Sequence, residues 1–486
     1  MAGIGFRLRA LGAQDGLLAP MASIGHSAVI AVGPWLFTVA ALALISVLST
    51  EHVSPSALDG FRLIVIYAFA ISLVSSAPIV LVAARLVGDA LYSRDVAQVR
   101  PLFVAASMLS AGASFAIALL CNLVIYDVPT DTAIQAAGCC AIGGLIWVAL
   151  AFCSAVRDYK GITQGFLLGL GAGVIATVAA ARLGSGWTVM ISAFNAGLLI
   201  VLAALASRVL ATFPQRVTSL SATMLAFVSG LTRHLPLVLA GLLGSIALWI
   251  DKWVMWTGPA GVRHELGLVH APFYDSAIFA AHLTIMPALA LFISQMETSF
   301  YACYRSYYSA IRDHCTLGQI ETKAERLKRT TLASLGHISL VQAAICLAVV
   351  LGAPTIIHAS GLFYQQVGVL RLGAVGALFQ FVFFATTSLL LFFDRRARFL
   401  ALQAVFLVLQ WTFAMVSIEM GTAYYGLGYL AAGAISAALA FAALERTMED
   451  ITFLTFRQTP RRFRLSFRAL HPRRFLPAMS AITKLE

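Results

Sequence analysis

The feature that most constrains this chain is a series of long apolar runs separated by short polar loops. Hydrophobic residues make up 60% of the 486-residue sequence, and charged residues only 11%. A helix needs about 20 apolar residues to cross a hydrocarbon core roughly 30 Å thick, and an open strand there would leave backbone groups unpaired. We therefore predict an all-α polytopic membrane protein with twelve spans, near residues 27–49, 62–86, 101–125, 133–156, 163–182, 187–211, 233–257, 273–300, 333–353, 366–392, 398–418 and 424–445.

Positive charge lies mainly on one side of these predicted spans. Of the 33 Lys and Arg residues, 28 lie in the N-terminal arm, in every second loop and in the C-terminal tail. Loops rich in Lys and Arg stay on the cytoplasmic side, so we expect both termini to be cytoplasmic. The net charge of +12 then reflects topology and contact with anionic lipid, and does not indicate nucleic-acid binding.

A linker rich in Ser and Thr divides the predicted spans six and six. The expected fold is two six-helix lobes around a central cavity. Mixed charges at near-helical spacing predict a cytoplasmic surface helix at 305–331, inside the second lobe. The full expected order is a cytoplasmic amphipathic arm, a first lobe, a cytoplasmic linker, a second lobe and a basic cytoplasmic tail, at 1–26, 27–211, 212–232, 233–445 and 446–486.

Small residues and prolines mark helix packing and kinks. Gly165, Gly169 and Gly173 form two overlapping G-x-x-x-G steps on one face of the fifth span, which lets helix backbones approach closely. Pro34, Pro78 and Pro287 are candidate kinks, and the last two hold comparable places in the two halves. The seven cysteines lie in spans or in loops assigned to the cytoplasm, so no disulfide framework is expected.

Two adjacent charges interrupt the seventh span, in the string LWIDKWVMW. At about 100° per residue, Asp251 and Lys252 share a stripe roughly 120° wide with the small residues Gly241, Gly244 and Ser245. Small faces pack against helices and charges avoid lipid, so we expect this stripe to face other helices or a cavity. Neighbouring residues on a helix point apart, which predicts separate partners for the two charges.

Their partners are predicted from depth in the membrane. Asp275 and Arg371 lie at a similar depth on spans that run inward, and Arg62 lies nearer the surface, which predicts a small charged cluster in the outer half. This cluster would line the exit of a conduit. The alternative is an interface pair that extends toward water beside a tryptophan belt.

The eighth span carries ionisable residues on one predicted face. Asp275, His282 and Glu297 fall together when about 100° is allowed per residue, along roughly 33 Å of helix. Together they indicate a water-accessible path, and structural hydrogen bonds inside the bundle are the alternative. At the inner end, Tyr304 and its neighbours Tyr301, Tyr307 and Tyr308 suit stacking against sugar rings at a cytoplasmic mouth, or an interfacial aromatic belt.

Five strings in order resemble the PelG family of exopolysaccharide transporters. They are GIGFRLR (Gly3 to Arg9), GPWLFT (Gly33 to Thr38), IDKWVMW (Ile250 to Trp256), LTIMPALALF (Leu283 to Phe292) and METSFYACYRSYYSAI (Met296 to Ile311). The resemblance implies the multidrug/oligosaccharidyl-lipid/polysaccharide exporter superfamily and alternating access between two lobes. It also implies a multi-pass protein of the bacterial inner membrane that exports a polymer rich in galactosamine and N-acetylgalactosamine to the periplasm.

The resemblance implies partners as well. These are a cytosolic glycosyltransferase of the PelF kind and membrane proteins resembling PelD and PelE. Two features depart from the family: the arm continues as ALGAQDGLLAP, and the basic tail at 446–486 is longer than usual. The tail is either a segment that docks on a membrane surface or partner, or a chain that anionic lipid attracts.

No catalytic centre, cofactor or metal site is expected. The chain has no G-x-x-x-x-G-K-[ST] string, and its acid pair Asp127 and Asp131 lacks metal-ligand company. His264 and His270 form no H-E-x-x-H arrangement. Energy would come from an ion gradient acting through Asp251, Asp275 or Glu297, or from polymerisation in a partner. The alternative functions are a flippase for a lipid-linked oligosaccharide, a drug exporter of the same superfamily, or a non-transporting scaffold of a synthase complex.

Overall fold

The computed structural model describes residues 18–156, 159–217 and 219–457, most of which are helical. Residues 1–17 of the predicted arm and 458–486 of the predicted tail lie outside the described residues. The remainder of the arm belongs to the first described helix, and the beginning of the tail belongs to the last two.

The described residues of the first half of the chain form six long helices. A short 3₁₀ turn, η1 (Val96–Gln98), precedes the third of them, and a π-helix, η2 (Cys121–Ile125), continues it. In chain order the long helices are α2 (Leu18–Ser49), α3 (Pro55–Tyr92), α4 (Val99–Leu120), α5 (Thr130–Val156), α6 (Tyr159–Arg182) and α7 (Trp187–Thr212).

The second half is more interrupted. It begins with three shorter helices, α8 (Leu220–Arg233), α9 (Leu235–Ala247) and α10 (Ile250–Thr257), followed by a hairpin of strands β1 (Val262–Arg263) and β2 (Val269–His270). The rest comprises α11 (Pro272–Leu283), α12 (Ile285–Gln295), the π-helix η3 (Met296–Phe300), α13 (Tyr301–Arg312), α14 (Leu317–Ala359), α15 (Gln366–Phe392), α16 (Arg396–Met420), the turn η4 (Thr422–Tyr424), α17 (Leu427–Glu449) and α18 (Ile451–Arg457).

The all-α polytopic fold is confirmed. Among the described residues, ten helices are long and apolar enough to cross a membrane, or eleven if the bent pair α8 and α9 is one span. Gly33–Ser49 of α2 forms a further, shorter apolar helix. Each predicted span overlaps described helix, several helices extend well beyond the predicted ends, and α15 has the predicted limits, 366–392.

The seventh predicted span is not one straight helix. Leu248 and Trp249 separate α9 from α10, and α8 meets α9 at an angle of 78°. Pro236 lies in the first turn of α9 and has no N–H to continue the hydrogen bonding of α8. Much of the predicted linker at 212–232 is therefore helix α8, and a wheel drawn through Gly241 and Asp251 as one helix does not apply.

The eighth predicted span is also divided. α11 ends at Leu283 and α12 begins at Ile285, because Pro287 cannot donate a backbone hydrogen bond to the carbonyl four residues before it. A five-residue π-helix, η3, then separates α12 from α13 and changes the angle per residue. A single straight face running from Asp275 to Glu297 is therefore not present.

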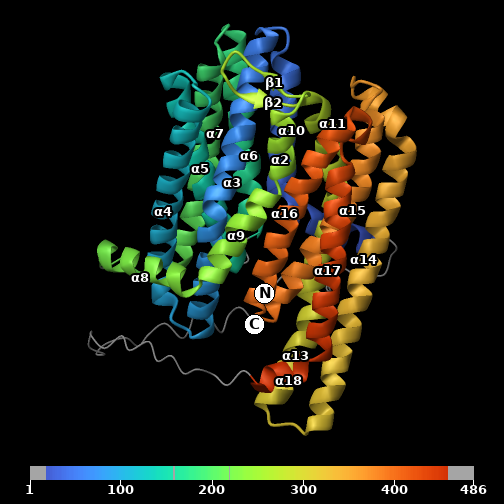
Figure 1. Cartoon of the computed structure of the whole chain (residues 1–486). Helices are drawn as coiled ribbons and strands as arrows, with labels where there is room; N and C mark the ends of the chain where they lie inside the picture. The colour runs from blue at the N-terminus through green and yellow to red at the C-terminus, as the bar shows by residue number, and fades with distance from the viewer. Residues whose placement is uncertain (1–17, 157–158, 218, 458–486) are drawn as a thin grey trace.

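The predicted surface helix at 305–331 is not a separate element. Its first part belongs to α13, and its second part begins α14, a continuous helix of 43 residues. His314 between them has a positive φ of 54°, which breaks the helix. Thr316 and Gln319 then form a capping box that starts α14. α13 and α14 thus form a helical hairpin, which Figure 1 shows at the lower right.

The N-terminal and C-terminal lobes of the described residues pack in a reciprocal way. α2 of the N-terminal lobe packs on α6 of its own lobe and on α12 of the other. Its counterpart in the C-terminal lobe, α9, packs on α16 of its own lobe and on α3 of the other. In Figure 1 the N-terminal lobe runs in colour from blue to green and the C-terminal lobe from light green to red. The lobes are therefore joined by equivalent helices that exchange equivalent contacts.

Glycines allow the closest helix contact of the N-terminal lobe. A Cβ on Gly169 would lie 2.8 Å from the backbone oxygen of Gly197 in α7, and one on Gly197 would lie 2.4 Å from Cα of Gly173. α6 and α7 therefore meet backbone to backbone, which larger residues would prevent. Gly165 faces Ala204 of α7 in the same seam. Pro34 and Pro78 lie inside α2 and α3, and neither ends its helix.

The two ends of the bundle carry different structures. The β1–β2 hairpin lies at one end, at the top of Figure 1, and pairs Val262 with His270. α18 lies at the opposite end with α13 and the start of α14. We refer to these as the hairpin end and the α18 end.

Candidate transport site

The carboxylate of Asp251 is the most buried charge of the candidate site. Asp251 lies in the first turn of α10, just after the break in the seventh span, and only 1% of the residue is exposed. The hydroxyl of Tyr274 in α11 donates to it at 2.9 Å. The Nζ of Lys252 donates to both carboxylate oxygens at 3.2 Å. Tyr274 of α11 and Lys252 of α10 thus hold the carboxylate between them.

The predicted separate partners for Asp251 and Lys252 are therefore wrong. Lys252 is long enough to turn back along α10, where its Nζ also donates to the carbonyl of Leu248 at 3.4 Å, in the break between α9 and α10. The rule that neighbours point apart describes Cβ directions, and the flexible lysine chain overcomes it. A buried carboxylate needs such a partner because an unpaired charge there is costly.

A second carboxylate lies on the neighbouring helix. Asp275, in the first turn of α11, accepts hydrogen bonds at Oδ2 from the indole N–H of Trp256 at 2.8 Å and from the backbone N–H of Ala271 at 3.0 Å. Its Oδ1 is buried and has no hydrogen-bond partner among the described residues. Asp275 also lies within electrostatic reach of Lys252 and Asp251. The two carboxylates thus belong to one group.

The indole that binds Asp275 also contacts the other lobe. Trp256 stacks on the ring of Tyr67 in α3, with ring centroids 4.8 Å apart and planes at 25°. The Tyr67 hydroxyl donates to the carbonyl of Val269 at 2.6 Å and accepts from its N–H at 3.2 Å. Asp275, Trp256 and Tyr67 therefore join the charged group to the contact between lobes at the hairpin end.

His282 lies two turns further along α11. Its Nδ1 is 2.8 Å from the carbonyl oxygen of Ile278, so that nitrogen carries the proton. Its ring lies 5.3 Å from the ring of Tyr429 in α17. Tyr429 in turn donates to Gln380 in α15. His282 thus lies beside a buried polar pair in the C-terminal lobe.

Three of the seven predicted path residues lie together, namely Asp251, Lys252 and Asp275, and His282 lies two turns further along α11. Glu297 is buried, 8% exposed, but lies beyond the break of the eighth span in the π-helix η3. Tyr304 lies in α13 toward the α18 end, 4.5 Å from the ring of Tyr308 and 6.2 Å from that of Phe393.

The two arginines of the predicted cluster bond elsewhere. Arg371 donates to the backbone carbonyl of Val350 in α14 at 3.1 Å and is exposed. Arg62 pairs with Asp59 of its own helix at 2.9 Å and donates to Ser46 of α2 at 2.8 Å. Similar depth did not bring these side chains together, because depth does not determine which way a helix faces.

The α18 end carries a different contact between the lobes. Arg85 of α3 lies 3.7 Å from Asp394, in the turn between α15 and α16. Asp394 also binds Arg396 at 2.7 Å, and Arg396 contacts His234 at the junction of α8 and α9. The lobes thus meet through aromatic rings at the hairpin end and through ionic groups at the α18 end.

Comparison with known proteins gives the family. Residues 1–456 match the sequence profile of the family "PelG: Putative exopolysaccharide Exporter (EPS-E)". The chain belongs to the PelG family. Among curated proteins, no sequence matches it.

Solved structures show that the PelG-family chain has the fold of MATE transporters. It is similar to a MATE protein in the bent conformation, with a TM-score of 0.65 and 16% identity over 94% of this chain and 100% of the other. A MOP-superfamily transporter from Pyrococcus furiosus Vc1 gives a TM-score of 0.62 at 15% identity over 93% and 99%. An outward-facing multidrug resistance MATE family transporter gives 0.60 at 16% identity over 93% and 100%.

Some members of the charged group of this PelG-family protein were not predicted from sequence. Tyr274, Trp256 and Tyr67 carry its hydrogen bonds and its link to the other lobe. The adjacency of Tyr274 and Asp275 in one string was an available signal, whereas nothing in the sequence connects Tyr67 with Trp256. The assembled group can hold charge and protons inside the C-terminal lobe, next to the contact between lobes.

Proposed function

We propose that this PelG-family protein carries a polymer rich in galactosamine and N-acetylgalactosamine from cytoplasm to periplasm. Membership of an exopolysaccharide exporter family is the observation that carries this proposal. The α18 end would face the cytoplasm of a bacterial inner membrane, with both termini on that side. The concentration of Lys and Arg in the arm, alternate loops and tail supports this orientation.

The proposed path runs from Tyr304 at the α18 end, past Glu297, to Asp251, Lys252, Asp275 and His282 near the hairpin end. The paired rings of Tyr304 and Tyr308 offer faces on which sugar rings stack. Arg371 is not included, because it is exposed and bonds to a backbone carbonyl.

Energy would come from one of two sources in this proposal. The buried carboxylates of Asp251 and Asp275 could bind and release a coupling proton or cation as the lobes move. Alternatively, polymerisation in a partner drives the chain through, and the charged group only holds α10 against α11. The open oxygen of Asp275 supports the first source, because a buried acceptor without a donor has capacity for a proton.

The proposed partners are a cytosolic glycosyltransferase of the PelF kind and membrane proteins of the PelD and PelE kinds. The projecting hairpin of α13 and α14 offers them a charged surface at the α18 end, with Glu325 and Arg329 exposed. Anionic lipid is the proposed contact of the basic segments. No catalytic role is proposed for any residue.

Three alternatives remain distinct proposals. A flippase for a lipid-linked oligosaccharide would use the cationic side chains between the lobes at the α18 end, where Arg85 and Arg396 lie. A drug exporter of the same superfamily would use Asp251 and Asp275 for cations and protons. A scaffold of the synthase complex would tolerate neutralisation of every buried charge.

The test measures periplasmic and secreted polysaccharide from cells that lack this chain. The cells are complemented with wild type, Asp251→Asn, Glu297→Gln or the matched control Arg371→Gln, at equal protein levels. Loss of export with polymer retained in the cytoplasm, in the first two variants only, would support the path. Normal export from all variants would keep export as the proposed function but would assign the driving force to the synthase. Normal polymer secretion without the chain would contradict the proposed function.

A further inference from the structure

The helix that leads into the seventh span runs across the bundle. α8 meets α9 at 78°, and Figure 1 shows α8 lying across the direction of the neighbouring helices. α9 has 13 residues and α10 has eight. With the two residues between them they cover about 34 Å at 1.5 Å per residue, which is enough for a hydrocarbon core roughly 30 Å thick. The crossing is therefore complete without α8, which lies close to the membrane plane.

α8 lies at the level where α3 leaves the membrane. A Cβ on Gly230 of α8 would lie 2.9 Å from the side chain of Leu86, the last residue of the second predicted span. α3 continues beyond Leu86 to Tyr92, which is 93% exposed. α8 also packs on α4, which begins at Val99. This level corresponds to the headgroup layer toward the α18 end.

The surface of α8 has three sectors. Phe227, which is 0% exposed, and Gly230 form the sector that packs on the N-terminal lobe. At about 100° per residue, Val228 and Leu225 fall at roughly 100° and 160° from Phe227. Leu225 is 73% exposed and Val228 is 43% exposed. Ser229 falls at roughly 200° and is exposed as well. An exposed apolar sector thus lies between the packed sector and a polar one.

Two hydroxyl residues share the apolar sector, and both are hydrogen bonded. Thr232 donates to the carbonyl of Ser229 at 2.9 Å, and the hydroxyls of Ser221 and Ser219 lie 3.2 Å apart. A polar group costs most in an apolar layer when it has no hydrogen-bond partner. These hydroxyls therefore leave the sector suited to acyl chains.

Positive charge predominates around α8. Residues 159–250 contain no Asp or Glu, whereas Arg216 precedes α8 and Arg233 ends it. Arg100 of α4 donates to the carbonyl of Pro214 at 3.2 Å, and so adds a cation beside the same segment. Two acids of the neighbouring segment are bonded to side chains near them, Asp89 to Arg85 and Asp95 to Gln98. Anionic headgroups attract clusters of arginine of this kind.

We infer that α8 is a surface helix that lies in the headgroup layer of an anionic phospholipid bilayer, toward the α18 end. Leu225 and Val228 contact acyl chains, and lipid phosphate lies beside Arg216. Amphipathic helices in this position bury their apolar face roughly 5–10 Å below the membrane surface. The lipid is bound whatever the protein carries.

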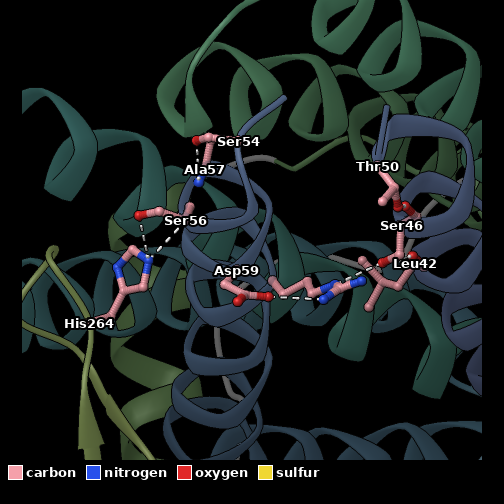
Figure 2. Close-up of polar contacts among 9 residues, drawn as sticks. Leu42, Ser46, Thr50, Ser54, Ser56, Ala57, Asp59 and His264 are labelled. Atoms are coloured by element: carbon pink, nitrogen blue, oxygen red, sulfur yellow. Dashed lines mark hydrogen bonds and ion pairs between the residues drawn. The ribbon is translucent and has the colours of Figure 1, made fainter. Parts of the chain in front are cut away.

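The bound lipid contacts the protein where the chain passes from one lobe to the other. α8 packs on the N-terminal lobe and leads into α9 of the C-terminal lobe. At the hairpin end, direct contacts hold the lobes together, such as that of His264 Nε2 with the carbonyl oxygen of Ser56 at 3.0 Å (Figure 2). The lipid thus lies at the covalent joint of the lobes, toward the opposite end from these contacts.

The experiment places a bimane fluorophore on α8 in protein reconstituted into vesicles of phosphatidylcholine and phosphatidylglycerol. Leu225→Cys carries the probe in the apolar sector, and Ser229→Cys carries it in the polar sector of the same helix. Leu340→Cys, 70% exposed on the membrane helix α14, gives the lipid reference. The native cysteines that are not fully buried are first replaced by alanine, namely Cys121, Cys303 and Cys315. The same protein without an added cysteine gives the background signal.

We expect nitroxide groups on the acyl chains to quench the probe of Leu225→Cys several times more than that of Ser229→Cys. Iodide in the water should quench the probe of Ser229→Cys more. Equal quenching by iodide at both positions would place α8 in water and overturn the inference. Equal quenching by the nitroxide at both positions would place α8 inside the hydrocarbon as a re-entrant segment, and would also overturn it.

The class of lipid is tested with the same probe. Nitroxide-labelled phosphatidylglycerol should quench Leu225→Cys at up to about fivefold lower concentration than labelled phosphatidylcholine, the factor for one arginine beside an anionic surface. Arg216→Gln should reduce this preference, whereas Arg326→Gln, at an exposed position of α14, should keep it. Equal quenching by the two labelled lipids would overturn the assignment of an anionic partner. No transport is measured, so the result does not depend on the proposed function.

Discussion

The hydroxyl of Tyr67 lies 2.6 Å from the carbonyl oxygen of Val269, and so joins a helix of one lobe to the hairpin of the other. The same hydroxyl accepts the N–H of Val269, so one side-chain oxygen satisfies both backbone groups of that residue. The ring of Tyr67 meanwhile stacks on Trp256, which holds Asp275. The contact between the lobes at Val269 is therefore linked to the charged group through Tyr67, Trp256 and Asp275.

Tyr67→Phe should lower the thermal unfolding midpoint of the purified protein. The variant keeps the stack on Trp256 but leaves two backbone groups of Val269 without their partner, a loss of about 1–3 kcal/mol. Unfolding in detergent, followed by tryptophan fluorescence, measures the change. Tyr364→Phe, at a position 74% exposed, is the matched control and should leave the midpoint unchanged. Equal midpoints for both variants would show that the hairpin contact adds no stability.

Gly197→Ala should destabilise the N-terminal lobe. The new methyl group would lie 2.4 Å from Cα of Gly173 and 2.7 Å from the carbonyl oxygen of Gly169, and backbone cannot move aside as a side chain can. Overpacking of this kind costs about 1–3 kcal/mol. Gly171→Ala, on the same helix as Gly173, meets nothing within 4 Å and should be neutral or slightly stabilising. The yield of folded protein after mild heating in detergent would rank the two variants.

The membrane helices could be predicted from the sequence more completely than the charged group. Spans were found because about 20 apolar residues are needed wherever a helix crosses lipid, and α15 began and ended as predicted. Breaks in a span were missed, above all at Leu248 and Trp249, where no proline marks the interruption. The pairing of Lys252 with Asp251 was missed for another reason, because the long lysine side chain turns back along α10 and a wheel of Cβ directions does not describe that.

Contacts between the two lobes could not be predicted. Ser56 and His264 are 208 residues apart, and Tyr67 and Val269 are 202 apart. Periodicity reports which face of a helix is polar, but it does not report which other helix lies opposite. Arg371 shows the consequence, since it shares the predicted depth of Asp251 and bonds to α14 instead.

Asp251→Asn should destabilise the protein, because it leaves Lys252 as a buried charge without its carboxylate. Their side chains are 2% and 14% exposed, and removal of one member of such a pair costs about 3–5 kcal/mol. The double variant Asp251→Asn/Lys252→Gln should recover most of that loss, which thermal unfolding in detergent would detect. If export stays absent in the recovered double variant, the carboxylate serves transport as well as stability. If export returns together with stability, Asp251 and Lys252 form a structural pair only.

Cross-linking Arg85→Cys to Asp394→Cys should stop export, because it would fix the two lobes together at the α18 end. The native side chains approach to 3.7 Å across the lobes, so a short bifunctional maleimide with a reducible bridge spans the site. The control pair, Arg85→Cys with Asp89→Cys, lies within α3, where the native side chains are 3.2 Å apart, and its cross-link cannot join the lobes. Secreted polysaccharide should fall in the first pair only and return after reduction. Both pairs remove the same arginine, so a loss of export that its removal causes would occur in both pairs before cross-linking. Continued export through the cross-linked first pair would contradict movement of the lobes at this end.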